Sequence, residues 1–435
     1  KAESVAIHAL AFGGDGVGRL ANGKAVFVPG VAAGERVGIR VFEEKRSHAF
    51  AELLGIETPA PERVVPRCPV ADRCGGCAWQ HLAIETQRGW KRRLLQVELE
   101  RKGLLGDGDV LAEVVAGECF AHRTRTRLHL RQGVFGTSRR RSHETIPLET
   151  CPILAPALER FALELGALAT ARLSVNADVE LYVDRLGRRG MAVQGEDLGA
   201  SSREAWGTIA QVMDLHALRV QVKPGASSGA LGERGRACLE EDSAGRALRF
   251  EPGAFVQTSR DINALLVREA LDLIETPGNF GELYAGVGNF SVHLAERIGR
   301  GTVAEGFPGS LASLRANLGI DDPGSSGVPG TKGAGGGVEV FCERDHESAR
   351  RLAGAPTLDM LFVDPPRAGI KALYPLFTER PPRALLMVSC HPMAALRDLE
   401  WLVRQAGYRL ERLVPVDLFP QTAHVEIVAR LTRAE

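Results

Sequence analysis

The sequence predicts an α/β protein in which an N-terminal β-barrel and a mixed α+β segment precede a parallel α/β domain. Three observations support this order: short, glycine-punctuated strands in residues 1–57, closely spaced cysteines early in residues 58–250, and strand–helix alternation in residues 251–435. The length of 435 residues indicates about three domains. With 44% hydrophobic and 25% charged residues, the chain is not wholly disordered, collagen-like or coiled-coil.

The first segment is expected to form a small barrel. Two β-rich runs, Val26–Val28 and Val37–Val41, follow turn sequences at Gly13–Gly16 and Asn22–Gly23. Strands this short, separated by turns at this spacing, are typical of small barrels.

The chain shows no membrane or export signal. No run approaches the ~20 apolar residues that a spanning helix needs, and no basic stretch followed by an apolar run opens the sequence. The formal net charge at pH 7 is zero, so nucleic-acid contact would require local basic patches. We therefore expect a cytoplasmic protein without membrane contacts.

A cysteine pattern in the second segment indicates a metal or cluster site. Cys68, Cys74 and Cys77 lie close together, and Cys151 follows downstream next to a proline. Four thiolates suit either an iron–sulfur cluster or zinc. The five-residue gap and the Cys-Pro pair favour iron–sulfur; zinc and unligated thiols remain the alternatives.

The rest of this segment combines a helix with a basic stretch. Residues 83–105 are predicted to be helical, with Trp90, Leu94 and Val97 on one face and Leu95 and Leu99 on a neighbouring one. Seven arginines then occur between residues 123 and 141. The spacing of Arg123, Arg125 and Arg127 would put all three on one face of a strand, where they could contact RNA.

From about residue 251 the pattern predicts a parallel sheet flanked by helices. The expected strands are Asn279–Leu283, Thr302–Glu305, Val338–Cys342, Met360–Val363, Ala384–Val388 and Val425–Leu431. The stretch Gly319–Gly337 is rich in glycine, serine and proline and is expected to be a flexible loop.

A glycine-rich turn indicates a nucleotide-like ligand. Gly286 and Gly288 follow the first expected strand, and Glu305 ends the next one. Glycines let backbone approach a ligand, and an acidic residue at Glu305 can accept both ribose hydroxyls. Ser291 occupies the place of the third glycine of dinucleotide-binding sites, which favours S-adenosylmethionine over NAD. A plain tight turn is the alternative.

Three further motifs lie at the same predicted sheet edge. Asp364 begins an Asp-Pro-Pro turn, Cys390 follows the next strand, and Glu426 opens the last one. In this arrangement a thiolate can serve as nucleophile and a nearby carboxylate as general base. Each has an ordinary alternative, namely a surface turn, an inert thiol and a solvated carboxylate.

Together these motifs resemble the bacterial RNA 5-methyluridine methyltransferases of the class that carries a TRAM domain and a [4Fe–4S] cluster, the 23S rRNA uracil-C5 type. The resemblance covers nearly the whole chain. It implies an OB-like TRAM barrel that binds RNA in residues 1–57. It further implies a central iron–sulfur domain with an Arg-rich RNA-binding segment in residues 58–250. Residues 251–435 would then form a Rossmann-like class I methyltransferase domain that uses S-adenosylmethionine.

The resemblance also implies roles for individual residues. The matching positions are cluster ligands Cys68, Cys74, Cys77 and Cys151; cofactor contacts Gln257, Tyr284, Gly286, Asn289, Glu305 and Asp364; substrate contacts Phe255, Gln257 and Arg367; nucleophile Cys390; and base Glu426. A further cofactor contact is expected at Glu343 or Asp345. One departure is His391, where the family usually has asparagine.

The implied reaction is methyl transfer from S-adenosylmethionine to carbon 5 of a uridine through a covalent bond from cysteine to carbon 6. The uridine must be flipped out of its stack to reach the thiol. Ribosomal RNA is favoured over transfer RNA, and a monomer is expected. The alternatives are a non-catalytic RNA-binding or ribosome-assembly factor that keeps the fold, and a NAD-linked or electron-transfer protein.

Overall fold

The structure is a computed structural model of the chain. It describes residues 2–106, 108–196, 198–222, 233–234, 238–275, 278–320, 337–343, 345–354 and 358–433. Most of the predicted loop at residues 319–337 lies outside these ranges. Among the described residues, none of the helices combines the length and apolar character needed to cross a bilayer.

Residues 2–58 form a closed five-stranded barrel, as predicted. Its strands, in the spatial order β1-β2-β3-β5-β4, are β1 (Ala2–Leu10), β2 (Gly16–Arg19), β3 (Ala25–Val28), β4 (Arg36–Glu44) and β5 (His48–Thr58). Alternate side chains of β1 and β4 fill the interior, among them Val5, Ile7, Val37 and Ile39. This period-two burial is what a sheet closed around a small apolar core requires.

A seven-stranded sheet forms the centre of the chain. Its strands, in the order β13-β12-β11-β10-β7-β8-β9, are β7 (Arg125–Arg131), β8 (Val134–Ser138), β9 (Thr145–Pro147), β10 (Ala177–Val183), β11 (Arg189–Gly195), β12 (Ala217–Val222) and β13 (Glu233–Arg234). Helices α2 (Pro156–Arg172) and α3 (Ala200–Val212) cover one face. The hairpin of β14 (Leu239–Ser243) and β15 (Arg246–Phe250) leads into the last domain.

The last domain is built on an eight-stranded sheet in the order β18-β17-β16-β19-β20-β22-β21-β6. Its strands are β16 (Phe280–Leu283), β17 (Gly301–Ala304), β18 (Val338–Phe341), β19 (Met360–Val363), β20 (Ala384–Ser389), β21 (Tyr408–Asp417), β22 (Glu426–Arg433) and β6 (Val115–Ala116). The five strands β16–β20 run parallel. All six predicted strands are present within a residue or two, whereas β21 was not predicted.

Helices cover both faces of this sheet. They are α4 (Arg260–Asp272), α5 (Ser291–Ile298), α6 (Pro308–Asn317), α7 (Asp345–Gly354), α8 (Tyr374–Glu379), which follows the short 3₁₀ helix η1 (Lys371–Leu373), and α9 (Pro392–Gln405). Side chains of β19 alternate between the two cores: Leu361 and Val363 face one, and Met360 and Phe362 face the other. The strand order reverses between β16 and β19, and a ligand crevice is expected at the carboxyl ends of strands at such a point.

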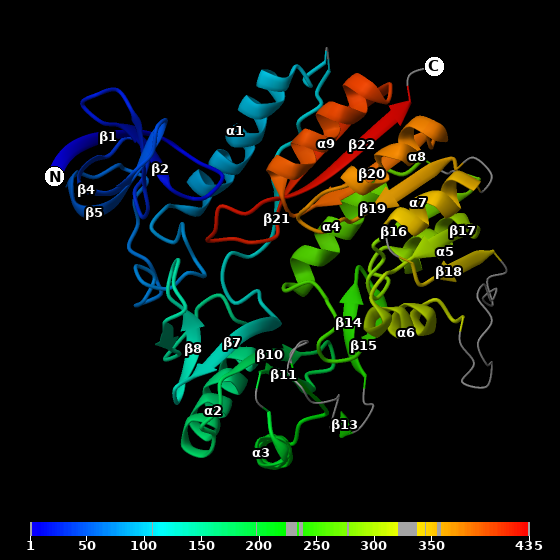
Figure 1. Ribbon diagram of the computed structural model, residues 1–435, viewed down its shortest axis with the longest axis horizontal. Helices are drawn as coiled ribbons and strands as arrows, with labels where there is room; N and C mark the ends of the chain where they lie inside the picture. Colours follow the sequence, from blue (N-terminus) through cyan, green and yellow to red (C-terminus); the bar gives the residue numbers. More distant parts are fainter. Residues whose placement is uncertain are drawn as a thin grey trace.

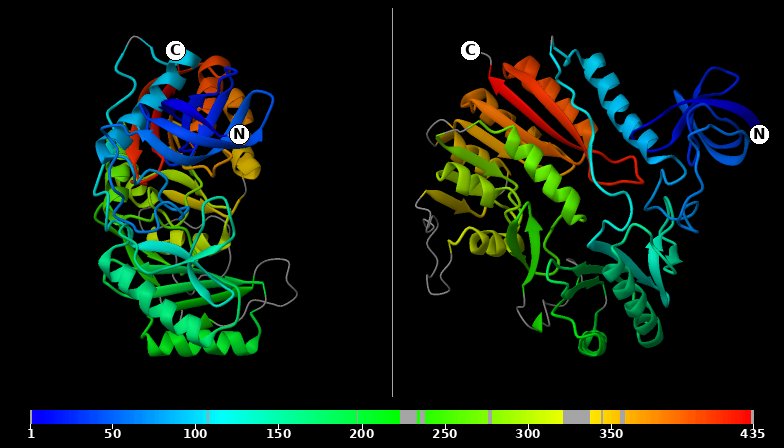
Figure 2. Two further views of the ribbon diagram at one scale, coloured as in Figure 1. Left: turned by 90° about the vertical axis from the view of Figure 1, so that its left-hand side faces the viewer. Right: turned by 180° about the vertical axis from the view of Figure 1, so that it is seen from behind.

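Helix α1 (Ile84–Lys102) follows the segment that contains Cys68, Cys74 and Cys77 and packs against this last domain. It packs beside α9, as the view from behind shows (Figure 2), and β6 extends the sheet at β21. The buried face of α1 is Gln87, Lys91, Leu95 and Leu99. Of the face grouped by spacing as Trp90, Leu94 and Val97, the last residue is 51% exposed.

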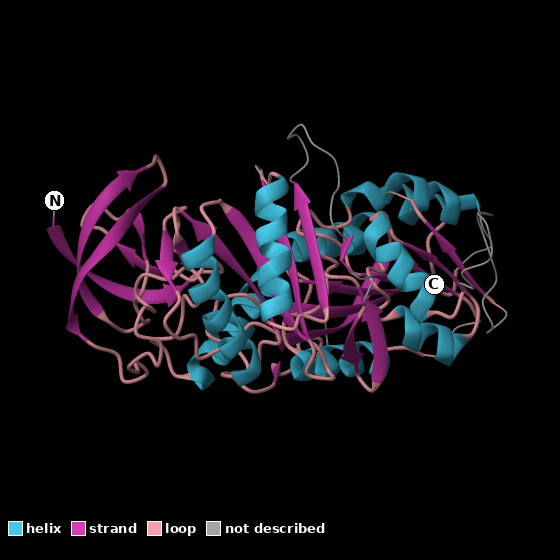
Figure 3. Ribbon diagram, turned by 90° about the horizontal axis from the view of Figure 1, so that it is seen from below, coloured by secondary structure: helices cyan, strands magenta, loops and turns pink. Residues whose placement is uncertain are grey.

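The three parts are arranged in order along the long axis of the molecule. The barrel lies at one end in Figure 1, the eight-stranded sheet at the other, and the seven-stranded sheet below and between them. The view from below shows the same elongated arrangement (Figure 3). The hairpin β14–β15 connects the central sheet to the last domain through a shared apolar cluster that includes Tyr182, Phe250 and Val287.

Candidate active site

A large pocket opens at the carboxyl ends of the parallel strands. Its volume is about 760 Å³. Ten of the residues predicted for cofactor, substrate or catalysis line it: Phe255, Gln257, Tyr284, Gly286, Asn289, Glu305, Asp364, Arg367, Cys390 and Glu426. They come from loops after β16, β17, β19 and β20, from the segment before α4, and from the start of β22. The fold therefore brings chain segments more than 170 residues apart to one cavity.

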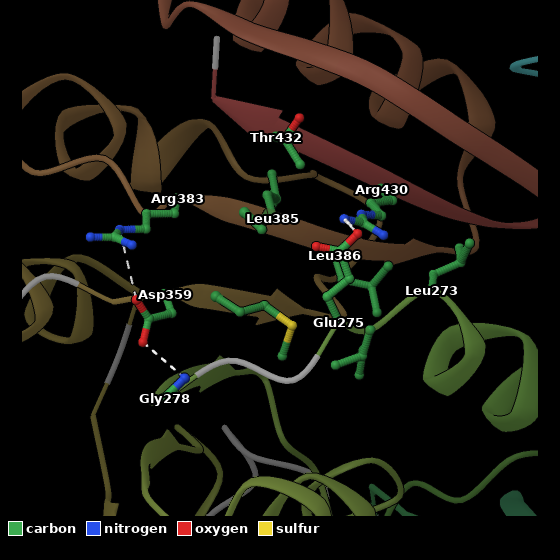
Figure 4. Close-up of a pocket in the computed structure, with 12 residues that line it drawn as sticks. Leu273, Glu275, Gly278, Asp359, Arg383, Leu385, Leu386, Arg430 and Thr432 are labelled. Atoms are coloured by element: carbon green, nitrogen blue, oxygen red, sulfur yellow. Dashed lines mark hydrogen bonds and ion pairs between the residues drawn. The ribbon is translucent and has the colours of Figure 1, made fainter. Parts of the chain in front are cut away.

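A second cavity of this domain lies at the opposite edge of the sheet, where the parallel strands begin (Figure 4). Its volume is about 360 Å³. The charged groups in it are paired: Arg430 contacts Glu275 at 2.6 Å, and Asp359 accepts a hydrogen bond from the Gly278 amide at 3.0 Å. It contains none of the predicted site residues, so the larger pocket is the candidate active site.

The glycine-rich turn after β16 shapes one end of the pocket. Tyr284 has φ of 64°, a left-handed backbone that a bulky residue adopts only under tertiary constraint. The next glycine, Gly286, donates its amide to the Glu305 carboxylate at 2.7 Å, and Phe307 donates to the other oxygen at 2.6 Å. The two amides fix the carboxylate at the end of β17, with lone pairs left for ligand hydroxyls.

Two asparagine side chains that bond to each other stabilise the same turn. The side chains of Asn289 and Asn263 exchange two hydrogen bonds, at 2.9 and 3.0 Å. Asn263 lies on α4 and lines the pocket, yet it was not predicted. It belongs to no local motif, because its partner is 26 residues away and the pair exists only after folding.

A buried carboxylate pair lies at the other end of the pocket. Burial raises the pKa of Asp364 to about 7, and it raises the pKa of Glu426 well above its usual value, with the charge of Asp364 adding to the effect. Glu426 is 1% exposed, and its Oε2 has no hydrogen-bond partner among the described residues. The pair therefore holds a proton near neutral pH, and one oxygen remains available for proton exchange.

The Cys390 thiol shares this environment. Burial and the nearby carboxylates of Glu426 and Asp364 raise its pKa to about 11, while Arg367 acts in the opposite direction. The free protein thus holds a neutral thiol at pH 7. The thiol must lose its proton before it can act as a nucleophile.

His391, the residue that departs from the asparagine expected at this position, caps a helix. It is the N-cap of α9, and its Nδ1 accepts a hydrogen bond from the Ala394 amide at 3.1 Å. Asparagine is among the best N-cap residues because its side-chain oxygen makes the same kind of bond. Histidine in this position therefore replaces the cap made by asparagine and leaves Cys390 at the amino end of the helix.

Two elements brace the loop between β21 and β22, which leads to Glu426. The buried Lys91 ammonium forms an ion pair with Asp417 and donates to the Phe419 carbonyl at 3.1 Å. The Gln87 Oε1 accepts from the Gln421 amide at 2.9 Å, and Gln421 accepts from the Trp79 amide at 2.9 Å. Helix α1 thus ties the loop before Glu426 to the cysteine-bearing segment.

The predicted arginine face is divided. Arg125 and Arg127 do share one face of β7, and both bind Glu180. Arg125 also donates to the Val256 carbonyl at 2.7 Å and lies 5.3 Å from the Phe255 ring, which is 59% exposed at the pocket mouth. Arg123 precedes the strand and is directed to a different pocket.

That different pocket, the cysteine pocket, has a volume of about 390 Å³ and is lined by Cys68, Cys74, Cys77 and Cys151. The Cys74 sulfur accepts a hydrogen bond from the Gly76 amide at 3.4 Å, and the N–H groups of Val70, Gln80 and Ile153 are directed at the sulfurs of Cys68, Cys77 and Cys151, in that order. Within the described ranges, no three His, Cys, Asp or Glu side chains are grouped to hold a single metal ion. The donors around the sulfurs suit four thiolates that share one bound group.

One further predicted contact is accounted for only in part. Of the two alternatives after β18, Glu343 pairs with Arg351, and the side chain of Asp345 lies outside the described residues.

Comparisons with known proteins agree with this arrangement. The TRAM domain family matches residues 3–54, and the family described as tRNA (Uracil-5-)-methyltransferase matches residues 346–434. The 23S rRNA (uracil(1939)-C(5))-methyltransferase RlmD of Chromohalobacter salexigens is 33% identical and covers 99% of this chain and 90% of its own. The enzyme of the same name from Edwardsiella ictaluri is 32% identical, covering 96% and 92%.

A solved structure has the same fold. The tRNA (uracil-54, C5)-methyltransferase of Pyrococcus abyssi, in complex with S-adenosyl-L-homocysteine, aligns with a TM-score of 0.73 at 23% identity over 99% of both chains. With a TRAM barrel at one end, a methyltransferase-type sheet at the other, and more than 30% identity over almost its full length, this chain belongs to the RNA uracil-C5-methyltransferase family that includes RlmD.

Proposed function

We propose that this protein transfers a methyl group from S-adenosylmethionine to carbon 5 of a specific uridine in RNA, through a temporary bond between Cys390 and carbon 6. The observation that carries the proposal is the shared pocket, which Cys390 and Glu426 line together with the turn that contains Gly286. The names of the relatives favour ribosomal RNA as the substrate class.

The turn end of the pocket suits the methyl donor. Glu305, held by two amides, has lone pairs free to accept hydrogen bonds from the ribose hydroxyls. The turn at Gly286, stabilised by the Asn289–Asn263 pair, would let the donor approach the backbone closely. Gln257 and Asp364 lie where they can hold the rest of the donor near the uracil. When bound, S-adenosylmethionine supplies a methyl group on a cationic sulfur.

Cys390 activates the uracil ring of the substrate. Once the Cys390 thiol has lost its proton to solvent, the thiolate adds to carbon 6 of uracil, which places an electron pair at carbon 5. That electron pair forms the new bond to the methyl group while the bond from the methyl group to the donor sulfur breaks, so the donor would leave as S-adenosylhomocysteine. Arg367, which also opposes the rise of the thiol pKa, is positioned to orient the uracil and to stabilise the charge that develops on it.

Glu426 completes the reaction. Its unpartnered Oε2 removes the proton from carbon 5, the double bond forms again, and the sulfur of Cys390 leaves as thiolate. The elevated pKa of the Glu426–Asp364 pair matches this carboxyl group to proton transfer near neutral pH.

The substrate must enter as a flipped nucleotide, because a stacked base cannot offer carbon 6 to a thiol. Phe255, exposed at the pocket mouth and braced through Arg125, offers a ring on which the extruded base or a neighbour can stack. The barrel, Arg127 and nearby cations would contact flanking RNA.

We further propose that the cysteine pocket binds a [4Fe–4S] cluster. Cys68, Cys74, Cys77 and Cys151 would be its ligands, and the donors already directed at their sulfurs fit an anionic sulfur-rich group. The bound group would link residues 68–77 to residue 151. It would thereby stiffen the segment whose Trp79 amide donates to Gln421 in the loop before Glu426.

The test is methyl transfer from labelled S-adenosylmethionine to total RNA that lacks 5-methyluridine, followed by nucleoside mass spectrometry of ribosomal and transfer fractions. Label in 5-methyluridine of the ribosomal fraction supports the proposal. Label only in the transfer fraction would change the substrate class. No label, from protein that binds S-adenosylmethionine, would favour a non-catalytic RNA-binding factor.

A further inference from the structure

Arg123 is an unusually isolated cation in this structure. Its Nε is shielded from solvent and has no hydrogen-bond acceptor, and it forms no ion pair with a carboxylate among the described residues. Most neighbouring arginines have a carboxylate partner: Arg125 pairs with Glu180, Arg139 with Glu144 and Arg141 with Asp15. Arg140, which lines the adjoining cavity, has none among the described residues. The Arg123 side chain as a whole is partly exposed. A shielded guanidinium N–H without an acceptor nevertheless costs free energy, so its acceptor is expected to be a group that binds later.

The backbone fixes Arg123 beside the cysteines. Its amide donates to the Ile153 carbonyl at 2.9 Å, and its carbonyl accepts from the Ala155 amide at 2.8 Å. Arg123 lines the cysteine pocket, and the sulfurs that act on its charge are those of Cys77, Cys151 and Cys74. The guanidinium thus lies beside the thiols of the cysteine pocket.

A second donor in the same pocket is also unsatisfied. Gln80 accepts from the Cys68 amide at 2.8 Å through its oxygen, whereas its buried Nε2 has no oxygen or nitrogen partner and is directed at Cys77. Two shielded N–H donors without oxygen acceptors, facing four thiols, indicate acceptors that are sulfur atoms. N–H donors and positive charge around a cluster set its stability and its reduction potential.

We propose that Arg123 is the charge partner of the group bound by the four cysteines, with its guanidinium donating to the sulfurs and balancing their negative charge. This inference rests on the proposed [4Fe–4S] cluster. It replaces the sequence-based expectation that Arg123 contacts RNA. Positive charge beside the cluster stabilises its reduced, more negative form, so loss of Arg123 should lower the reduction potential.

The test compares wild-type protein with Arg123→Met, Arg123→Lys and the control Arg127→Met, all prepared without oxygen. Arg127 lines the same pocket, but its side chain is 60% exposed and paired with Glu180. The readouts are iron and sulfide per chain, the rate of iron release to a chelator, the reduction potential by spectroscopic titration, and the salt dependence of RNA binding. Circular dichroism reports whether each variant is folded.

We expect Arg123→Met to release iron about tenfold or more faster than wild type, which is the usual effect of losing an outer-shell partner, and to have a lower potential. Arg123→Lys should lie between, because it keeps the charge but loses the Nε donor. Arg127→Met should match wild type in iron release and reduction potential, whereas its RNA binding should weaken, since Arg127 is proposed to contact flanking RNA.

Wild-type release and potential in Arg123→Met would overturn the inference, as would a loss of RNA affinity alone with a reduced salt slope. If Arg123→Met does not fold, the test rests on Arg123→Lys. Iron release as slow as in Arg127→Met supports the role of charge, and folded Arg123→Lys protein that holds no cluster refutes it. Wild-type protein without iron and sulfide would refute the cluster itself, while the methylation assay tests the enzyme separately.

Discussion

At the scale of single residues, the proposed chemistry depends on groups whose pKa values the pocket alters. Cys390 is a neutral thiol in the free protein, and the pKa of the Asp364–Glu426 pair is raised by burial. The residue types and their positions after strands could be predicted from the sequence. Their pKa values could not, because they arise from burial and from carboxylates that are 62 residues apart in the chain.

The first residue-scale prediction concerns pH. Nucleophile and base both act in deprotonated form, and both pKa values are raised, so the single-turnover rate of methyl transfer should increase with pH from about 6 to about 9. Rapid-quench measurements on preformed complexes check this, since they exclude product release. A flat rate over this range would contradict the assignment.

The second residue-scale prediction concerns the helix cap. Because His391 caps α9, His391→Ala should lower the free energy of unfolding by ~1 kcal/mol, whereas His391→Asn should stay close to wild type. Urea unfolding of the three proteins is the measurement. Equal losses in both variants would mean that the imidazole contributes something other than the cap.

At the scale of elements, buried polar contacts decide which surfaces meet. The sequence predicted α1 within one residue at its start and three at its end, and it grouped Val97 with Trp90 and Leu94 on one face, although Val97 is exposed. The true buried face includes Gln87 and Lys91, which look like solvent-exposed residues until Asp417 and Gln421 approach from over 320 residues away. Hydrophobic periodicity cannot reveal such a face. The predicted strands of the last domain match the structure because a short apolar run is a local signal.

The element-scale prediction concerns Lys91. Lys91→Met would leave Asp417 buried near Arg88 alone, so we expect a loss of ~3–5 kcal/mol in stability. The loop before Glu426 should loosen as well, with a lower rate constant for methyl transfer and little change in the Kd for S-adenosylmethionine. Unfolding and cofactor titration measure the two effects.

The matched control for Lys91 is the surface pair of Arg189 and Glu164 on the central sheet. Arg189→Met should change stability by less than ~1 kcal/mol, because exposed pairs contribute little. A similarly small loss in Lys91→Met would show that α1 does not hold the loop through this ion pair.

At the scale of the whole molecule, the barrel, the central sheet and the methyltransferase sheet meet around buried side chains. Trp79 lies next to the cysteine pocket. Its indole N–H donates to the Gly14 carbonyl of the barrel at 2.9 Å, and its amide contacts Gln421 in the loop before Glu426. The order of the three parts could be predicted from composition and motifs. Their mutual arrangement could not, since it rests on contacts between distant single residues.

The whole-molecule prediction concerns the junction between barrel and centre. A cavity of about 410 Å³ there is lined by Arg140, which forms no ion pair among the described residues. A phosphate contact contributes a slope of roughly 0.7–0.9 to the dependence of log K on log salt. We therefore expect Arg140→Met to reduce the salt slope of RNA binding by about that amount, measured by filter binding. No change in slope, with Arg189→Met as the reference, would place the RNA elsewhere.

The central claim is that Cys390 bonds to carbon 6 of a uridine while Glu426 removes the proton from carbon 5. It is tested most directly with RNA in which the target uridine carries fluorine at carbon 5, because a base cannot remove fluorine as it removes a proton. We predict a protein–RNA complex that survives denaturation, with RNA attached to the peptide containing Cys390, and no complex with Cys390→Ala. The account would be contradicted if protein active on ordinary RNA formed no such complex, or if the RNA were attached to a different residue.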